Sequence, residues 1–455
     1  MFRKILIANR GEIAVRIIRA ARELGIATVA IYSTADKEAL HTMLADEAIC
    51  IGPARSRDSY LNMNAIISAA VVTGAEAIHP GFGFLSENST FATLCREVGI
   101  SFIGPSGEVM DMMGDKINAR TQMIQANVPV IPGSDGEIMT ADEALAVATE
   151  IGYPVMLKAS AGGGGKGIRK VEKAEDLVDA FESASSEAKA AFGNGAMYLE
   201  RVIYPARHIE VQILADQFGH VIHLGERDCS LQRNNQKVLE EAPSIAIGQT
   251  LREKIGQAAV RAAAVGYENA GTIEFLLDEA SGQFYFMEMN TRVQVEHPVT
   301  EFVTGIDIVK EQIRIAAGQE LNVRQEDIVI QGHAIECRIN AENPALNFAP
   351  SPGKISNLYL PSGGVGVRVD SAVYSGYTIP PYYDSMIAKV IVHGANRFEA
   401  LMKMQRALYE LEIDGLVTNT DFQLDLIADR RVVAGDYDTA YLMEEFLPRY
   451  CEEVG

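Results

Sequence analysis

Short apolar runs alternate with helical patterns through the first hundred residues of the chain. An apolar strand is expected at 4–8, a turn follows at Asn9-Arg10-Gly11, and 12–24 has the spacing of an amphipathic helix. Further strands are expected at 27–32, 75–78 and 101–103. Because strands that alternate with helices are typical of parallel sheets, this pattern predicts an open, mostly parallel α/β sheet.

The pattern changes twice along the rest of the chain. A predicted helix at 107–126 is followed by Pro129 and Pro132, so a second domain is expected to begin near residue 113. That domain continues with a strand at 154–158, a hairpin at 272–288 and a helix at 298–317. A third domain is expected from strands at 328–339, 354–360 and 385–393 and a helix at 396–411.

Composition limits the classes of protein to which the chain can belong. Its 455 residues exceed what one hydrophobic core usually serves, and 48% hydrophobic beside 22% charged residues is typical of soluble globular proteins. No apolar run approaches the roughly 20 residues of a membrane span, and the run at 5–8 is too short for a signal peptide. We therefore expect no membrane association and a cytoplasmic location.

Charge and cysteine content exclude further classes. A net charge of −21 argues against a nucleic-acid partner, because phosphate backbones need a broad basic surface. The five cysteines form no C-x-x-C pair, which argues against a zinc ribbon or a dithiol redox site. Cys229 lies close to Lys237 and could act as a base or nucleophile, but the prediction favours a buried, apolar cysteine.

A run of glycines at 162–165 follows the strand predicted at 154–158. Consecutive glycines let backbone N–H groups approach phosphate oxygens without obstruction, so the run indicates a phosphate-binding loop. Lys166 is followed by Gly167 and not by Ser or Thr, so the segment is not a Walker A motif. The alternative is a flexible surface loop.

Two glutamates occupy symmetric places in the predicted hairpin. Glu274 and Glu288 lie equally far from a turn near Ser281, so a symmetric hairpin would make them cross-strand neighbours with Cβ atoms roughly 5 Å apart. A divalent cation between them would offset their repulsion, and carboxylates suit Mg²⁺ or Mn²⁺. The alternative is a solvated strand face that carries two unrelated glutamates.

Polar residues then recur at every second position. An extended chain would place Glu288, Asn290, Arg292, Gln294 and Glu296 on one face. That face would hold a metal-binding carboxylate, an amide, a guanidinium suited to oxyanions and a carboxylate that could act as a base. The mixture favours a chemical site over a solvated strand.

At these residues the chain resembles, nearly from end to end, the biotin carboxylase subunits of bacterial acetyl-CoA carboxylases, which belong to the ATP-grasp superfamily. The resemblance rests on the glycine run and on the segments IANRGEIA at 7–14, HPGFGFLSEN at 79–88, ERDCS at 226–230, QK at 236–237, EEAP at 240–243 and EMNTRVQVEHP at 288–298. It implies a three-domain ATP-grasp fold with an N-terminal open parallel-sheet domain at 1–113, an ATP-grasp domain at 114–330 and a C-terminal biotin carboxylase domain at 331–455. A mobile glycine-rich lid would span about 131–203.

The resemblance also implies which residues bind the nucleotide. ATP would bind between the lid and the hairpin, and two Mg²⁺ or Mn²⁺ ions would be held by Glu274, Glu288 and Asn290. The implied nucleotide contacts are Lys116, Lys158, Gly164, Gly165, Glu200, Arg201, Val202, Ile203, His208, Asn235, Glu274, Leu276 and Glu288.

The implied reaction has two stages. Lys237, Arg292, Gln294 and the Val295 backbone would bind bicarbonate, and Glu296 would deprotonate it for attack on the γ-phosphoryl group, giving carboxyphosphate and ADP. Carboxyphosphate would break down to CO₂ and phosphate, the phosphate would take the proton from the biotin ureido nitrogen, and Arg338 would stabilise the biotin enolate. Biotin would be a substrate on a separate carrier protein and would not be attached to this chain.

The implied setting is the first half-reaction of acetyl-CoA carboxylase in fatty acid synthesis. The partners would be the biotin carboxyl carrier protein, carboxyltransferase subunits and a second copy of the chain in a homodimer. A biotin carboxylase subunit of another acyl-CoA carboxylase or of a pyruvate carboxylase stays open. So do two rivals: an ATP-grasp ligase with a different acceptor, such as ammonia in carbamoyl phosphate synthesis, and a nucleotide-sensing regulator.

Three positions qualify the resemblance. Phe82, implied to lie on the biotin side, stands where a tyrosine is usual, and Asn235 stands where a histidine that contacts the nucleotide is usual. Met402-Lys403-Met404 has the composition of a biotin-acceptor site, which would make the chain its own carrier. Apolar residues recur at helical spacing around Lys403, so a helix is predicted there instead.

Overall fold

The computed structural model describes residues 1–160 and 167–454, which form two compact units. The first unit comprises Met1–Met113, Arg207–Glu274 and Met289–Gly455. The second comprises Gly114–Ala206 and Phe275–Glu288. Because each unit draws on separate stretches of sequence, the division into three consecutive domains remains a prediction.

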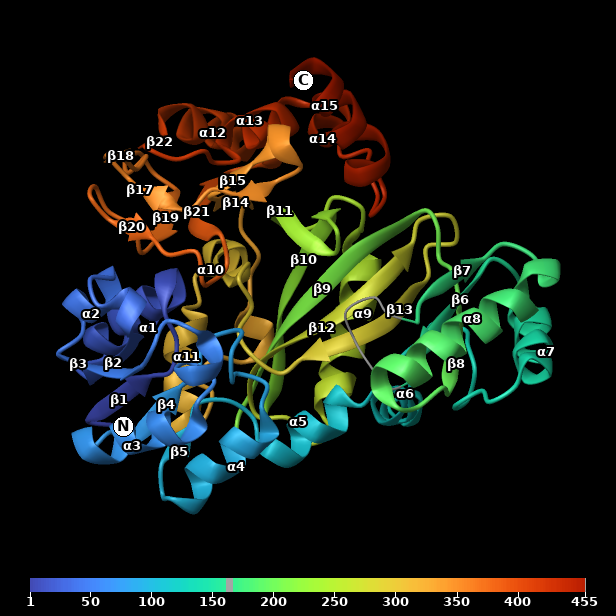
Figure 1. Ribbon diagram of the computed structural model, residues 1–455, viewed down its shortest axis with the longest axis horizontal. Helices are drawn as coiled ribbons and strands as arrows, with labels where there is room; N and C mark the ends of the chain where they lie inside the picture. The colour runs from blue at the N-terminus through green and yellow to red at the C-terminus, as the bar shows by residue number, and fades with distance from the viewer. Residues whose placement is uncertain (161–166, 455) are drawn as a thin grey trace. The chain divides into compact units, whose positions relative to one another are not determined.

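The N-terminal part of the first unit is a parallel sheet of five strands (Figure 1). Its order is β3-β2-β1-β4-β5, with β1 at Lys4–Ile7, β2 at Ala27–Ser33, β3 at Glu47–Gly52, β4 at Ala77–His79 and β5 at Ser101–Phe102. The predicted βαβ alternation is confirmed, but strand β3 was not predicted. It is an edge strand with mostly exposed side chains, so it lacks the apolar run by which the others are recognised.

Helices accompany this sheet, and the first of them, α1, buries its apolar face. Helix α1 (Gly11–Glu23) follows the predicted turn and packs Ile13, Ile17 and Ile18 into the core below it. The other helices of this part are α2 (Leu40–Leu44), α3 (Met63–Thr73), α4 (Ser89–Glu97) and α5 (Gly107–Gly114). The single helix predicted at 107–126 is in fact two, because the Asp115 carboxylate accepts hydrogen bonds from the N–H groups of Ile117 and Asn118 and begins a new helix.

A second, larger sheet has eight strands in the order β13-β12-β9-β10-β11-β14-β21-β19. Its members are β9 (Ala206–Ala215), β10 (Val221–Arg233), β11 (Gln236–Ala242), β12 (Asn269–Asp278), β13 (Phe284–Asn290), β14 (His333–Asn340), β19 (Val367–Ser371) and β21 (Met386–Gly394). Strands β12 and β13 confirm the predicted hairpin. The associated helices are α9 (Gln249–Ala263), α10 (His297–Thr304) and α11 (Ile308–Ala316). The helix predicted at 298–317 is interrupted at Gly305, whose φ of 74° ends α10.

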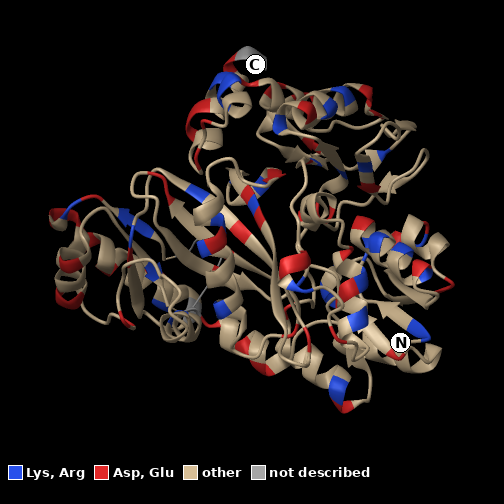
Figure 2. Cartoon of the chain, turned by 180° about the vertical axis from the view of Figure 1, so that it is seen from behind, with Lys and Arg blue, Asp and Glu red and all other residues tan. Residues whose placement is uncertain are grey.

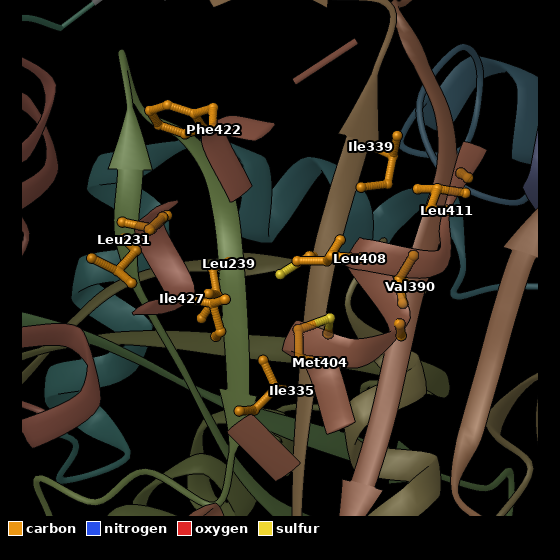
Figure 3. Packing of buried hydrophobic residues seen from close by; sticks show 14 of the residues in the cluster. Leu231, Leu239, Ile335, Ile339, Val390, Met404, Leu408, Leu411, Phe422 and Ile427 are labelled. Carbon is orange, nitrogen blue, oxygen red and sulfur yellow. The ribbon is translucent and has the colours of Figure 1, made fainter. Parts of the chain in front are cut away.

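The C-terminal end of the large sheet has its own apolar core (Figure 3). Helix α12 (Arg397–Glu410), predicted from its periodicity, packs Met404 and Leu408 against Ile335 and Val390 of the sheet. Its Lys403 ammonium donates to the His393 carbonyl, as a helix side chain. The remaining elements here are α13 (Thr420–Ala428), α14 (Arg430–Ala434), α15 (Leu447–Val454), β15 (Glu342–Asn343), β16 (Ala349–Pro350), β17 (Gly353–Lys354), β18 (Asn357–Tyr359), β20 (Thr378–Ile379) and β22 (Glu412–Asp414).

The second unit is built on a three-stranded antiparallel sheet of order β7-β6-β8. Its strands are β6 (Val155–Ala159), β7 (Arg169–Val171) and β8 (Met197–Arg201), and its helices are α6 (Lys116–Gln125), α7 (Ala141–Ile151) and α8 (Ala174–Phe192). Helices α7 and α8 close the core with Ala144, Leu177 and Phe181. The predicted strand at 154–158 is confirmed by β6.

Charged residues are spread over the helices and strands of both units (Figure 2). Asp and Glu outnumber Lys and Arg by 61 to 40, in keeping with the net charge of −21. Within 1–160 and 167–454, no helix has the length and apolar character needed to cross a membrane.

Candidate active site

Lys237 on β11 is the centre of a buried charge cluster in the first unit. Its ammonium donates to Glu274 Oε1 at 2.9 Å and Glu296 Oε1 at 2.6 Å, and it also bonds Glu210. The three carboxylates come from β9, from β12 and from the residue before α10. Sequence segments almost ninety residues apart therefore converge on one cation.

The amides of Asn290 and Gln294 hold Glu274 from another side. Both donate to Glu274 Oε1 at 2.9 Å, and His208 Nε2 lies 3.1 Å from Glu274 Oε2. The predicted grouping of Glu274, Asn290 and Gln294 is therefore a set of direct contacts. Each donor compensates a carboxylate that is only 7% exposed.

Arg227 on β10 holds several residues of the cluster through its guanidinium. Its guanidinium is fully buried and reaches Glu210, Gln212, Thr272, Gln294 and Thr300. Gln294 accepts from this guanidinium through Oε1 at 3.2 Å and so turns its amide N–H group toward Glu274. The orientation of a residue implied to bind bicarbonate is thus set by a residue outside the predicted site.

The proximity of opposite charges determines the protonation states. Burial alone would raise the pKa of Glu296, but Lys237, Arg338 and Arg227 hold it well below its ordinary value. Burial would likewise raise the pKa of Glu274, but Lys237 and His208 lower it far more. Burial would lower the pKa of Lys237, and the surrounding carboxylates instead raise it well above the usual range. At neutral pH Lys237 therefore carries its proton and Glu274 and Glu296 are ionised, whereas burial raises the pKa of Glu210 above its ordinary value.

Arg338 on β14 connects the cluster to the C-terminal part of the sheet. Its guanidinium contacts Glu240 Oε1 and lies 3.0 Å from Glu296 Oε2. Glu296 is thus shared between Lys237 and Arg338, which are the residues implied to act on bicarbonate and on biotin respectively. The carboxylate implied to be the base lies between them.

Arg292 points toward a different partner. Its Nε donates to Glu87 Oε2 at 2.8 Å and its Nη2 to Asn290 Oδ1 at 3.0 Å. Glu87 belongs to the segment 79–88, which the resemblance associates with biotin as the acceptor in place of ammonia. That segment is held in turn by Asn9, whose Nδ2 donates to the carbonyls of Pro80 and Phe82.

The prediction of one extended strand from Glu288 to Glu296 is wrong beyond Asn290. Strand β13 ends there, the chain bends at Arg292 and turns at 295–296, and α10 begins at His297. The turn arises because Pro298 favours the first turn of a helix and Gln294 is held by Arg227. The polar side chains still meet, but through this turn and not through strand alternation.

A separate cavity of about 120 Å³ lies in the second unit. Lys158, Glu200 and Glu288 line it together with apolar residues that include Phe286 and Met287. Lys158 and Glu200 form an ion pair across β6 and β8. Three residues implied to contact the nucleotide therefore share one cavity.

The remaining implied adenine contacts lie at and beyond the end of β8 and on β12. Ile203 and Leu276 pack in a small apolar cluster with Ile131, Ala206 and Tyr285. The Val202 N–H donates to the Pro154 carbonyl, and Arg201 donates to the Tyr285 hydroxyl at 3.2 Å. Gly164, Gly165 and the side chain of Lys116 lie outside the described residues.

Asn235 and Phe82 have local structural explanations. Asn235 lies in the tight turn between β10 and β11 with a φ of 62°, a left-handed conformation that asparagine tolerates better than most residues. Phe82 is half-buried against the core below α1. The Cys229 thiol is buried and its pKa is raised well above its ordinary value, chiefly by burial, so it is a poor nucleophile.

Carboxylates suited to metal binding lie within the first unit. Ligand atoms of His208, Glu210 and Glu274 all lie within 4.8 Å of one another. Glu274 and Asn290 also present oxygens of the kind that Mg²⁺ prefers. The donor set on this side therefore fits a hard divalent cation, whereas Glu288 belongs to the other unit.

Sequence reasoning missed Glu210, Arg227 and Glu87. Arg227 stands in the ERDCS segment that carried the resemblance, and Glu210 follows two residues after His208, on the same face of β9. The available signal was the recurrence of charged residues within a strand-like run, such as Arg207, His208 and Glu210 in β9. No spacing rule connects these residues to Lys237.

Comparisons with known proteins cover nearly the whole chain. Three family models match: "Biotin carboxylase, N-terminal domain" over 1–110, "Carbamoyl-phosphate synthase L chain, ATP binding domain" over 115–324 and "Biotin carboxylase C-terminal domain" over 336–444. Biotin carboxylase 1 of Bacillus subtilis is 59% identical over 97% of this chain and 98% of its own length.

Solved structures agree with the family models. A biotin carboxylase from Campylobacter jejuni in a beta-gamma-ATP complex is 52% identical, with a TM-score of 0.92 over 97% of this chain and 98% of that one. The biotin carboxylase domain dimer of a Hydrogenobacter thermophilus 2-oxoglutarate carboxylase, with MgADP, ADP and bicarbonate, is 53% identical, with a TM-score of 0.90 over 98% of both chains. The predicted fold class is confirmed.

Proposed function

The chain belongs to the biotin carboxylase family, and from that premise we propose that Lys237, Arg292, Gln294, Val295 and Glu296 activate bicarbonate for the ATP-dependent carboxylation of biotin. The observation that carries the proposal is the convergence of three carboxylates on Lys237, with Glu296 shared between Lys237 and Arg338. An ATP-dependent ligase needs an anion site beside a base, and this cluster supplies both.

In the proposed first step, bicarbonate exchanges into contacts now made by carboxylates. Lys237 and Arg292 bind its oxygens, while Gln294, oriented by Arg227, donates its amide hydrogen. Glu296 is ionised and accepts the bicarbonate proton. A bicarbonate oxygen then attacks the γ-phosphorus, the bond to ADP breaks, and carboxyphosphate forms.

Glu274, Asn290 and Glu288 are proposed to hold two Mg²⁺ or Mn²⁺ ions. Bound there, such ions would supply positive charge against the transferring phosphoryl group. Among the described residues, Lys158, Glu200, Ile203 and Leu276 are proposed to contact ATP. His208 supports the metal side through its contact with Glu274.

Arg338 is proposed to serve the second step. Carboxyphosphate breaks down to CO₂ and phosphate, and the phosphate removes the proton from the biotin ureido nitrogen. The negative charge that develops on the ureido oxygen is matched by the Arg338 guanidinium, which Glu240 and Glu296 hold in place. Biotin arrives on a separate carrier protein.

The wider setting is also a proposal. We favour the first half-reaction of acetyl-CoA carboxylase in the cytoplasm, with a biotin carboxyl carrier protein, carboxyltransferase subunits and a homodimer. A relative of nearly equal identity serves a 2-oxoglutarate carboxylase, so another final acceptor is the alternative. Purified complexes tested with acetyl-CoA, other acyl-CoA thioesters and keto acids would separate these cases.

The deciding experiment is ADP release with bicarbonate and Mg²⁺, with and without free biotin. Biotin should stimulate the release and ammonia should not. Arg338→Ala should lower biotin carboxylation at least a hundredfold while reducing biotin-independent ATP hydrolysis less than tenfold, because its proposed role begins after carboxyphosphate forms.

The matched control is Arg406→Ala, which removes a surface arginine paired with Glu410 on α12. It should leave both activities unchanged. Stimulation by ammonia in place of biotin would refute the proposed acceptor. Equal losses of both activities in Arg338→Ala would refute the enolate role.

A further inference from the structure

Lys389 on β21 is a fully buried lysine that the proposed chemistry does not use. Its ammonium donates to the Val295 carbonyl at 2.7 Å and lies 3.2 Å from Glu12 Oε1 and 4.0 Å from Asp370 Oδ2. Burying an ammonium destabilises the fold unless the charge is paired. The burial of Lys389 against a backbone carbonyl therefore suggests a role beyond packing.

Neighbouring strands place the carboxylates and cations around this lysine. In the sheet register Lys389 is opposite Arg338 on one side and Asp370 on the other, so the three side chains share a face. Glu336, two residues before Arg338, faces the same way, is fully buried and contributes negative charge to Lys389 when ionised. Arg368 forms a paired contact with Asp370 and also bonds Glu301.

Glu12 comes from the turn segment at 9–12 that the nucleotide chemistry left unexplained. It lies in the first turn of α1, is 5% exposed, and neither of its oxygens accepts a hydrogen bond from the described residues. Its Oε1 is nevertheless within ion-pair distance of Lys389. Burial raises the pKa of Glu12 and the charge of Lys389 opposes that rise, so the lysine and this otherwise unsatisfied carboxyl group support each other.

The backbone on both sides of Val295 is fixed by such buried groups. The His297 ring Nδ1 lies 2.7 Å from the Gln294 carbonyl, which can only accept, so Nδ1 carries the proton. In a trans peptide the N–H and carbonyl point in opposite directions, so this bond also sets the direction of the Val295 N–H. Lys389 fixes the next peptide, between Val295 and Glu296, by its carbonyl.

We propose that Lys389 is a positioning residue for the bicarbonate site: it holds the Val295 carbonyl, and with it the peptide that leads into Glu296, and thereby orients the Glu296 carboxylate, while His297 sets the direction of the Val295 N–H. Glu12 and Asp370 keep the ammonium in place. The inference rests on the proposed function, because it assumes that the segment 292–296 binds bicarbonate. It adds residues from α1, β19 and β21 to a site so far built on β9 to β14.

The test is Lys389→Met, which keeps the length of the side chain and removes the ammonium. With saturating ATP and Mg²⁺, the KM for bicarbonate in ADP release should rise at least tenfold, while the KM for ATP stays within twofold of wild type. A change confined to bicarbonate is the signature of positioning, because general unfolding would alter both substrates alike.

The control for lost packing is Lys403→Met. Lys403 on α12 also donates to a backbone carbonyl, that of His393 on β21, at 2.8 Å, but this acceptor lies outside the segment 292–296. Its removal should leave both KM values unchanged. Circular dichroism and thermal melting of each variant show whether it folds.

A double variant addresses the case in which Lys389→Met is too unstable. Glu12→Gln combined with Lys389→Met removes both buried charges, which is often tolerated better than removing one. It should melt closer to wild type than the single variant yet keep the raised KM for bicarbonate. If bicarbonate binding recovers together with stability, the lysine only compensates charge and the inference is wrong.

The remaining outcomes separate this inference from the proposed function. If wild-type protein shows no bicarbonate-dependent ADP release, the proposed function fails. If wild type responds to bicarbonate but Lys389→Met retains its KM within twofold, the positioning role fails alone. A parallel rise in both KM values would also overturn it.

Discussion

Glu241 on β11 gives the clearest stability prediction, because four contacts converge on one buried carboxylate. His333 Nε2 lies 2.6 Å from Oε2, Arg397 donates through Nε at 2.6 Å and Nη2 at 3.1 Å, and the Tyr437 hydroxyl also bonds it. Burial alone would raise the pKa of Glu241, but the His333 hydrogen bond and the Arg397 charge lower it to about 2. Glu241 therefore anchors the strand that carries Lys237.

The size of the effect follows from that pKa. A folded pKa of about 2 against an ordinary value of 4.5 corresponds to roughly 3 kcal/mol of stabilisation at neutral pH. Because the folded pKa is the lower one, this contribution is present above about pH 4.5 and is lost as the pH falls toward 2. Glu241→Gln should remove it, which is about a hundredfold change in the equilibrium for local opening.

Hydrogen exchange followed by mass spectrometry is the suitable assay, because a chain with two compact units does not offer a single unfolding equilibrium. Amides of β11 and β14 in Glu241→Gln should exchange about a hundredfold faster than in wild type at pH 7.5. The difference should shrink to about tenfold at pH 3. Equal protection at pH 7.5, or a difference that grows on acidification, would refute the reasoning.

The neighbouring residue supplies an internal control with the opposite sign. Glu240 points to the other face of β11, and burial raises its pKa to about 7 despite Arg338. A raised folded pKa means that stability is lost as the pH rises from about 4.5 through 7. Glu240→Gln should therefore cost little protection at pH 8. A loss as large as that of Glu241→Gln would show that any change on β11 has the same effect.

Two further predictions concern Arg227, which holds the cluster around Lys237, and Asn235, which lies in the turn before that lysine. Arg227→Met should destabilise the first unit by about 3–5 kcal/mol because it leaves Glu210 with one cation fewer, and the double variant with Glu210→Gln should regain part of that loss. Hydrogen-exchange protection of β9 and β10 measures both effects. Unchanged protection in Arg227→Met would contradict the pairing. Asn235→Val should weaken the β10–β11 turn by about 1–2 kcal/mol because of its left-handed backbone, whereas Asn235→Gly should not. Equal hydrogen-exchange protection of the β10–β11 hairpin in the two variants would argue against backbone strain.

The spacing of apolar residues predicted the helices and strands that bury one face along a short stretch of sequence. The N-terminal βαβ alternation, the β12–β13 hairpin and α12 all follow from apolar spacing over ten to fifteen residues. Strand β3 was missed because its side chains are largely exposed, so no alternation marks it. The break at Asp115 was missed because a capping carboxylate inside an amphipathic run looks like one more polar position.

The site residues that recur at regular spacing along the chain could be predicted. Those that reach the site from distant parts of the sequence could not. Period two selected Asn290, Gln294 and Glu296, and all three belong to one network, although the chain turns where extension was expected. Glu210 and Arg227 reach that network through pairing of β9 with β10, which no local spacing encodes. Tertiary contacts therefore decide the protonation and orientation of groups that the sequence only identifies by type.

The eight-stranded sheet also constrains the order in which the chain can mature. Its strands begin at Ala206 and end at Gly394, and β14 pairs with β21 across about fifty residues. A growing polypeptide can complete the first sheet once residue 102 is available, yet β14 keeps an unpaired edge until β21 has been made. Nascent chains that stop before Met386 should consequently aggregate through that edge, and Lys389 would reach Val295 only in the last stage of synthesis.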